Sequence, residues 1–317
     1  MTAVTLHDLQ VSVQDKTAFT TLADYAHIGQ TFLELISRIQ PTRIISPTHN
    51  NYIFYQYDEP YGYRVTRPLN TDLFMESSHE FELAFARFMT FLADVRQYED
   101  AVTGRKSTQA YIAANEINKV VYTVQQSIGS VGDSFGNPNQ SRKRIGQLFE
   151  TLIKLIIQEV GLECEPRTIK IPIPGYPDQV MPYELDLVFS RNKALVTAES
   201  GFIDLTEIVG SVKTTSKDRI DKIFLDKFLL TKLLGREVPV VAIFLHDVQR
   251  AVKGKSIFGV NSTFKSNHFL GYTVALNSLD GVYYVDPRPD MIANQRLREQ
   301  IADFQTFLVQ DLWRLSG

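Results

Sequence analysis

The sequence predicts an α/β or α+β protein, in which a mixed β-sheet is flanked by helices and preceded by a helical N-terminal region. Apolar residues in 1–129 recur mainly at helical spacing, whereas 130–317 alternates short strand-like runs with helix-like segments. Between them, the run GSVGDSFGNPNQS at 129–141 is rich in Gly, Ser and Asn. This composition is typical of a loop, so we predict a module boundary there.

The first region is predicted to be mostly helical. Its helices are expected at residues 20–39, 81–95 and 111–128, where apolar side chains recur three and four positions apart. Between the first two, NYIFYQYDEPYGYRVTRP at 51–68 alternates in hydrophobicity and is rich in tyrosine. That pattern predicts a short hairpin with its turn at Glu59 and Pro60.

The second region begins with an amphipathic helix at 144–160 and continues mainly with strands. A helix is predicted at 219–234, followed by a fully buried strand at 238–245 with the sequence VPVVAIFL. A closing helix is predicted at 291–315. The other strands are expected at 168–173, 184–189, 193–198, 205–213, 272–276 and 282–285.

Composition excludes several kinds of site. The 317 residues carry a net charge of −3, so any surface that binds a polyanion must be local. A single cysteine rules out a disulfide framework and a cysteine-rich zinc site, and the six histidines form no HExxH pair. Neither a signal-peptide pattern nor an apolar run near the ~20 residues of a membrane helix is present. We therefore expect a soluble cytoplasmic protein with no membrane partner.

Two candidate residues lie on predicted strands. Asp186 stands in YELDLVFS on the face opposite Leu185 and Leu187, and a carboxylate there is costly to bury unless it is paired or bound to a metal. Ser211 and Lys213 lie two positions apart, so their side chains share one face of a strand end. Taken alone, each residue is better explained structurally, Asp186 as a solvated aspartate on an exposed or edge strand and Lys213 as a lysine at a strand end.

Two further carboxylates lie on predicted helices. Asp226 follows Lys213 by thirteen residues, and Glu150 lies at the rim of an apolar helical arc. Together with Asp186 and Lys213 they supply the groups needed for Mg²⁺-assisted phosphodiester hydrolysis, because Mg²⁺ prefers oxygen ligands and activates a water molecule. The order of these residues permits one shared site but does not by itself bring them together.

This order, a glutamate on a helix, an aspartate on a strand and then Ser-x-Lys, resembles the PD-(D/E)XK nuclease fold of restriction endonucleases. The stretch SVKTTSKDR at 211–219 is similar to a motif of the EcoRII-like group of type II restriction endonucleases. QSRKRIGQLFE at 140–150 resembles a helix of the same group, with Ser141, Arg142, Gly146 and Glu150 matching. The resemblance spans residues 138–245.

The resemblance implies roles for the four candidate residues. Asp186 would be the central metal ligand, Lys213 the catalytic lysine, and Glu150 a further group at the Mg²⁺ site. Asp226 would stand where the family places a displaced glutamate. The chain departs from the family pattern at two positions: Leu185 replaces the usual proline, and Asp226 is an aspartate with a shorter reach.

The resemblance also implies that the segment after the lysine reads bases in the major groove. Arg219 can bond guanine through two atoms, Asp218 can accept from a cytosine amine, and Lys217 can donate to guanine. The alternative is a helix start with exposed charges. Contacts to the DNA backbone are expected from the basic triplet Arg142, Lys143 and Arg144. The alternative for this triplet is the solvated start of a helix. The hairpin tyrosines Tyr55, Tyr57 and Tyr61 are candidates for stacking on a flipped base. The alternative is that they pack against the helical region.

We therefore expect a homodimeric type II restriction endonuclease that uses Mg²⁺ and cuts double-stranded DNA to leave 5′-phosphate ends. Its site would be palindromic with a CC–GG core of the CCNGG, CCWGG or CCGG type, with or without flanking bases. Residues 130–317 would form the catalytic and recognition core, and 1–129 would add dimer and DNA contacts. In a prokaryotic cytoplasm it would be paired functionally with a DNA methyltransferase. The alternatives are a higher oligomer, a structure-specific repair or recombination nuclease, and a non-catalytic DNA-binding protein on the same fold.

Overall fold

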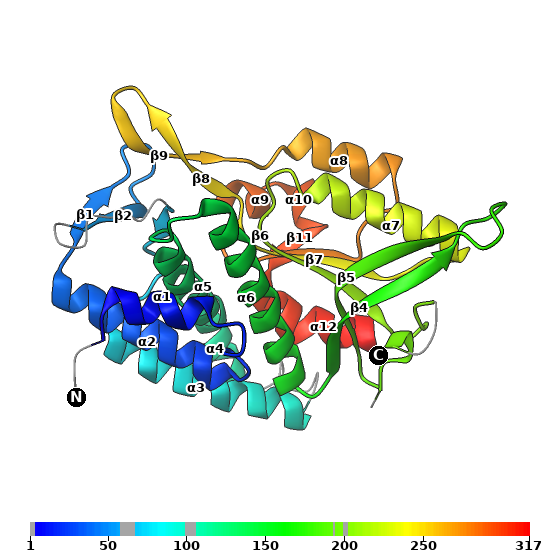
Figure 1. Ribbon diagram of the computed structural model, residues 1–317, viewed down its shortest axis with the longest axis horizontal. Helices are drawn as coiled ribbons and strands as arrows, with labels where there is room; N and C mark the ends of the chain where they lie inside the picture. The colour runs from blue at the N-terminus through cyan, green and yellow to red at the C-terminus, as the bar shows by residue number, and fades with distance from the viewer. Residues whose placement is uncertain (1–3, 58–66, 99–105, 193, 199–201) are drawn as a thin grey trace. The chain divides into compact units, whose positions relative to one another are not determined.

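A computed structural model describes residues 4–57, 67–98, 106–192, 194–198 and 202–317, and the chain divides into two compact units (Figure 1). The first unit contains Met1–Phe91, Ala110–Leu152 and Val248–Thr263. The second contains Leu92–Gln109, Ile153–Asp247 and Phe264–Gly317. The predicted assignment of catalysis to 130–317 remains a prediction about function.

Helices make up most of the first unit, as predicted. They are α1 Leu6–Gln14, α2 Leu22–Ile39, α3 Ser78–Tyr98, α4 Lys106–Ala113, α5 Glu116–Gly132 and α6 Pro138–Glu159, of which α3, α4 and α6 each have one end in the second unit. Thr5 and Thr21 begin α1 and α2 with capping boxes, in which each threonine and an aspartate three residues later satisfy each other's backbone N–H groups. The predicted loop at 129–141 is shorter than expected, because α5 continues to Gly132 and α6 starts at Pro138.

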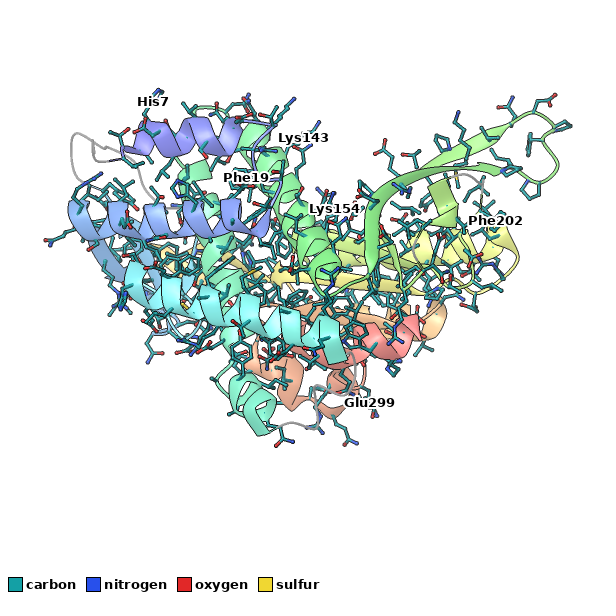
Figure 2. The ribbon with its side chains drawn as sticks, turned by 90° about the horizontal axis from the view of Figure 1, so that it is seen from below. His7, Phe19, Lys143, Lys154, Phe202 and Glu299 are labelled. Carbon is teal, nitrogen blue, oxygen red and sulfur yellow. The ribbon has the colours of Figure 1, made fainter. Side chains whose placement is uncertain are left out.

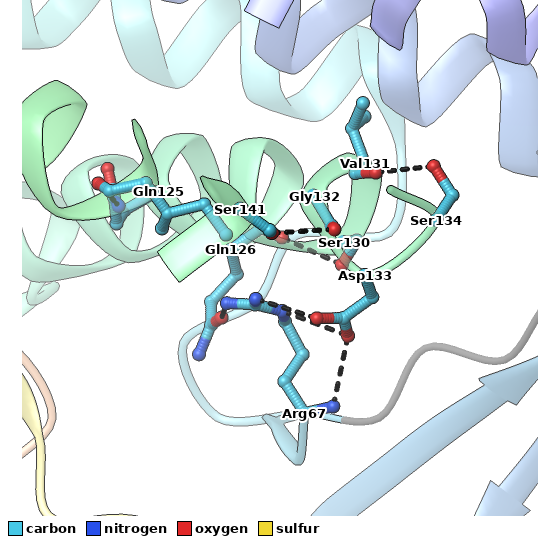
Figure 3. A network of polar contacts seen from close by, with 10 residues as sticks. Arg67, Gln125, Gln126, Ser130, Val131, Gly132, Asp133, Ser134 and Ser141 are labelled. Carbon is cyan, nitrogen blue, oxygen red and sulfur yellow. Dashed lines mark hydrogen bonds and ion pairs between the residues drawn. The ribbon is translucent and has the colours of Figure 1, made fainter. Parts of the chain in front are cut away.

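Helix α5 is buried along nearly its whole length, although it carries many polar side chains. Those groups need partners, because an unpaired polar group in a protein interior is destabilising. Figure 3 shows one such arrangement, in which the guanidinium of Arg67 donates to Asp133 at 2.9 Å and to Gln126 at 3.2 Å. Gly129 leaves the space for it, since a Cβ atom there would lie 1.8 Å from the Arg67 Nη1 atom.

The first unit also contains two small antiparallel sheets. One has the order β1-β2-β3, with β1 Thr42–Ile45, β2 Tyr52–Gln56 and β3 Leu69–Asn70. The predicted tyrosine-rich hairpin therefore holds a true strand, β2, but β2 pairs with β1 as well as with β3. The predicted turn at Glu59 and Pro60 lies outside the described residues. The other sheet is a hairpin that the sequence did not predict, β8 Val248–Lys253 with β9 Ser256–Ser262.

A six-stranded mixed sheet forms the centre of the second unit, which confirms the predicted fold class. Its order is β11-β10-β7-β6-β5-β4, with antiparallel pairing between β4, β5 and β6 and parallel pairing between β6, β7, β10 and β11. The strands are β4 Glu163–Pro172, β5 Val180–Ser190, β6 Ile208–Thr215, β7 Val240–His246, β10 Gly281–Tyr284 and β11 Ile301–Asp303. Every residue of β7 is buried, as its uninterrupted apolar sequence predicts.

One face of this sheet is covered by α7 Ile220–Leu234 and α8 Ser266–Ala275. Phe224 of α7 packs edge-on against Phe269 of α8, with ring centroids 5.5 Å apart, and also against Tyr272. Burial of these rings, together with Val209, Val240 and Val282 from the sheet, forms a continuous apolar core. The core holds the ends of β5, β6 and α7 in fixed relative positions.

Three predicted elements of the second unit are wrong. In place of the strand predicted at 272–276, residues 272–275 form the end of α8 and Leu276 is its C-cap residue, because burial of Phe269 against α7 overrides the strand preference of the local sequence. Of 193–198, Val196–Ala198 form a short 3₁₀ helix, η2, held by hydrogen bonds from Thr197 to the buried carboxylate of Glu207, and residue 193 lies outside the described residues.

The predicted helix at 291–315 is broken into several pieces. Helix α9 Pro289–Ala293 ends where Asn294 caps α10 Gln295–Arg298 by accepting from the N–H groups of Arg296 and Leu297. Strand β11 then pairs with β10, and α11 Phe304–Thr306, the π-helical turn η3 Phe307–Asp311 and α12 Leu312–Ser316 follow. In the described part of the chain, no helix is both long and apolar enough to cross a lipid bilayer.

Candidate active site

The site forms where two neighbouring strands separate. Strands β5 and β6 pair at Phe189–Ile208, Val188–Val209 and Leu187–Gly210, and the described ladder ends there. Beyond this point β6 continues to Thr215 along β7, while the other end of β5 pairs with β4 in a hairpin that extends to the right in Figure 1. At the fork β5 and β6 no longer pair with each other, although each stays paired with its other neighbour.

Asp186 and Lys213 meet at this fork. The Oδ2 atom of Asp186 accepts from the Lys213 Nζ atom at 2.5 Å, from the Ser211 hydroxyl at 3.1 Å and from the Val212 N–H at 3.0 Å. The Val212 N–H is free to do this because β5 has left the ladder. The prediction that Ser211 and Lys213 share one face of the strand end is confirmed, since both reach the same oxygen.

Asp226 lies on α7 and takes part in a second polar group. Its Oδ1 atom accepts from the Tyr183 hydroxyl at 2.7 Å, and its Oδ2 atom accepts from Lys222 at 2.9 Å. Burial raises the pKa of Tyr183, and the hydrogen bond to Asp226 raises it further. Tyr183 therefore stays protonated and keeps donating to Asp226 across the ordinary pH range.

The two groups line one cavity of about 560 Å³, built entirely from the second unit. Asp186 and Lys213 enter it from β5 and β6, and Asp226 enters from the second turn of α7. Arg219, at the start of α7, lines the same cavity. The structure thus brings together four of the residues singled out in the sequence, from three separate elements.

The oxygen atoms of this cavity fit Mg²⁺. All hydrogen bonds of the Asp186 carboxylate go to Oδ2, so within the described residues its Oδ1 atom has none. Mg²⁺ is commonly held by one or two carboxylates, with water and substrate phosphates completing its shell. No group of three or more His, Cys, Asp or Glu side chains suited to a metal is found in the described ranges. The carboxylates of Asp186 and Asp226 in the cavity lining match such a donor set, and the role of Asp186 as a metal ligand remains a prediction.

The predicted base-reading residues follow β6 directly. Lys217, Asp218 and Arg219 are all exposed, and Arg219 is the N-cap residue of α7 without a side-chain capping bond. Asp218 has φ of 51°, in the left-handed region that most residues avoid. The backbone carbonyl of Ser216, a buried residue, anchors this turn by accepting from the N–H groups of Arg219 and Ile220. The turn therefore presents three charged side chains from a fixed backbone.

The remaining predicted residues lie in the first unit. Glu150 is partly buried on α6, and its place at the metal site remains a prediction. Arg142 and Lys143 are exposed at the start of α6, and Lys143 is labelled in Figure 2. Arg144 instead donates to the backbone carbonyls of Val13, at 2.7 Å, and Asp15, so part of its guanidinium is already used to hold the end of α1.

The tyrosines expected to stack on a flipped base have different surroundings. Tyr55 and Tyr57 are each only 4% exposed, and the Tyr55 hydroxyl donates to Glu76 at 2.6 Å. This burial agrees with the alternative interpretation, in which the tyrosines pack against the helical region. Tyr61 lies outside the described residues.

Two residues of the site were not predicted from the sequence. Lys222 precedes Asp226 by four positions on a helix, and this spacing is a detectable signal for an ion pair. Tyr183 carries no comparable signal, because its contact with Asp226 depends on how α7 packs over β5.

No protein-family model and no curated protein matches this sequence. Among solved structures, the chain is similar to that of Kpn2I, described as a type IIP restriction endonuclease, with a TM-score of 0.67 and 19% identity. This likeness covers 98% of the present chain and 97% of the Kpn2I chain. A structure of the restriction endonuclease PspGI with substrate DNA gives a TM-score of 0.40 and 12% identity, over 63% of this chain and 80% of that one. The likeness to Kpn2I shows that the chain has a restriction-endonuclease fold.

Proposed function

We propose that this protein is a Mg²⁺-dependent type II restriction endonuclease that cuts double-stranded DNA. The observation that carries the proposal is the convergence of Asp186, Lys213 and Asp226 on one cavity where β5 and β6 separate. The fold shared with Kpn2I, which is described as a type IIP restriction endonuclease, supports the proposal.

In this proposal each group of the cavity has a distinct chemical task. Asp186, with Oδ1 available, holds the metal, which supplies charge stabilisation at the phosphate and a more acidic water. The Lys213 ammonium, a compact positive charge, holds the attacking water and stabilises negative charge on the scissile phosphate. Asp226 keeps the hydrogen bond from Tyr183 to Oδ1 and exchanges Lys222 at Oδ2 when it contributes an oxygen to the site. Glu150 is proposed as an additional group, as the resemblance implies.

Sequence recognition is assigned to Lys217, Asp218 and Arg219. Their fixed turn matches the need to hold donors and an acceptor against G·C pairs in the major groove. Arg219 also lines the cavity, so reading and cutting are coupled through one short segment. We propose a palindromic CC–GG core of the CCNGG, CCWGG or CCGG type, read by a homodimer that leaves 5′-phosphate ends and whose host DNA is protected by a methyltransferase. Arg142 and Lys143 are proposed backbone contacts.

The test is incubation of the purified protein with unmethylated phage DNA and Mg²⁺, beside the Lys213→Ala variant. Discrete fragments that the variant does not produce are expected, and sequencing of their ends gives the site. Cleavage only of branched DNA would assign the protein to structure-specific nucleases. Binding of DNA without cleavage, or a smear that the substitution leaves unchanged, would refute the proposed activity.

A further inference from the structure

The segment that contains β8 and β9 has an unusual charge pattern. Residues 248–279 include no Asp or Glu, although these residues number 36 of 317 and a stretch of this length would on average hold three or four. Its basic residues are Arg250, Lys253, Lys255 and Lys265. A locally basic stretch in a chain with a net charge of −3 is the kind of local surface that a polyanion requires.

The β8–β9 hairpin is anchored at one end only. Val248 and Val260 are buried against Tyr52 and Phe54 in a small apolar cluster of the first unit. The Val260 N–H donates to the Thr48 hydroxyl oxygen at 2.9 Å. These contacts fix the base of the hairpin and leave its other end without a role in the core.

The free end is the hairpin tip, residues 250–255, and its shape is set by two irregularities. The strand register shifts between Ala251 and Lys253, and Gly254 has φ of 59°, which favours glycine. Lys253 also lies against Gly259, where a Cβ atom would be 2.6 Å from the Lys253 Cγ atom. These features give the backbone of the tip a defined shape.

The three cations of the tip have no partner in the described part of the protein. Arg250, Lys253 and Lys255 are exposed, and none of their side chains makes a hydrogen bond or ion pair with a described residue. By contrast, Arg43 and Arg87 of the same unit each pair with a glutamate. Three like charges on one short turn repel each other, and an external polyanion relieves that repulsion.

We propose that Arg250, Lys253 and Lys255 at the hairpin tip bind the phosphate backbone of DNA. The inference rests on the proposed function for the identity of the polyanion. Chain connectivity supports it: β7 ends at His246, which pairs with Thr215 just before the base-reading residues, and β8 begins at Val248. A two-stranded ribbon is also a form that fits along a DNA groove. The tip adds affinity and carries no base specificity.

The expected effect is a change in salt dependence. Each phosphate contact contributes about 0.9 to the slope of log affinity against log salt, so loss of three contacts lowers the slope by about 2.7. Between 50 and 200 mM salt the wild type would then lose about 40-fold more affinity than the variant R250A/K253A/K255A. The measurement is fluorescence anisotropy of a labelled duplex of arbitrary sequence in EDTA, where no cleavage occurs.

Two control variants make the test specific. R250K/K253R/K255R keeps the three charges and should keep the slope. K16A/R296A/R298A removes three exposed charges elsewhere, from the turn after α1 and from α10, and should change the slope much less. If the triple alanine variant does not fold, K255A alone should lower the slope by about 0.9.

Several results would overturn the inference. One is an unchanged slope in R250A/K253A/K255A. Another is an equal decrease of the slope in K16A/R296A/R298A. The third is a loss of DNA affinity in R250A/K253A/K255A that is accompanied by dissociation of the oligomer in light scattering. Cleavage assays separate this inference from the proposed function. If the wild type cuts DNA and the slope is unchanged, only the hairpin assignment fails. If it cuts no DNA but the slope falls as expected, the hairpin assignment stands and the nuclease proposal fails.

Discussion

Replacement of Lys213 by alanine tests the proposed chemistry most directly. The substitution removes an ammonium whose nitrogen lies 2.5 Å from the Asp186 Oδ2 atom, while that oxygen keeps its hydrogen bonds from Ser211 and Val212. The side chains of Lys213 and Asp186 are 28% and 22% exposed, so the pair is neither fully screened nor fully buried. We expect the free energy of unfolding to fall by about 1 kcal/mol, between the values typical of surface and buried pairs.

The expected effect on cleavage is much larger. Loss of one charged donor at a reacting centre typically lowers the rate by about 10²–10³-fold, which corresponds to about 2.7–4 kcal/mol. A loss of stability near 1 kcal/mol leaves the protein folded and cannot produce such a change. The rate and the stability therefore distinguish a catalytic lysine from a structural one.

The assay is single-turnover cleavage of a labelled duplex that carries the mapped site, beside a thermal unfolding curve for each variant. Lys232→Ala is the matched control, since Lys232 is an exposed lysine of α7 that lies over the Phe228 ring and does not line the cavity. It should cleave at the wild-type rate. A Lys213→Ala protein that stays folded and cleaves within about threefold of the wild-type rate would refute the role given to Lys213.

Three further predictions concern other parts of the molecule. Gly129→Ala should lower the free energy of unfolding by about 3 kcal/mol in denaturant titration, because the new Cβ atom would displace the Arg67 guanidinium shown in Figure 3. Gly146→Ala is the control and should not destabilise the protein, because a Cβ atom there would have no neighbour within 4 Å. Tyr183→Phe should raise the Mg²⁺ concentration needed for half-maximal cleavage about tenfold, because Asp226 loses a bond of 2.7 Å; an unchanged Mg²⁺ dependence would contradict this. Arg219→Lys should reduce discrimination against substituted G·C pairs by about 1–3 kcal/mol, measured from cleavage of variant sites, and equal discrimination would exclude guanine reading by this residue.

Part of the candidate site could be predicted from the sequence because its geometry is local. Ser211 and Lys213 share a face since side chains alternate along any strand, and the same rule places Asp186 away from Leu185 and Leu187. The position of Asp226 could be predicted because its helix begins just after the strand that carries Lys213. Each of these relations needs only a few consecutive residues.

Other features depend on contacts between distant segments and left no local signal. Residues 272–276 have the composition of a strand, yet burial of Phe269 on Phe224 keeps 272–275 helical. The Tyr183–Asp226 bond joins residues 43 positions apart. The β8–β9 hairpin is anchored by Tyr52 and Phe54, almost 200 positions earlier in the chain.

The sequence by itself determined the alternation of strands and helices in the second half, the strand end that carries Lys213, and the charged turn at 217–219. These follow from side-chain periodicity and from residue chemistry, which act over a few positions. Only the tertiary structure decided that β5 pairs with β6 no earlier than Leu187, so that β6 continues beyond Gly210 without β5, which frees the Val212 N–H and opens the cavity. Where strands separate depends on the packing of the whole sheet with α7, and no short stretch of sequence contains that information.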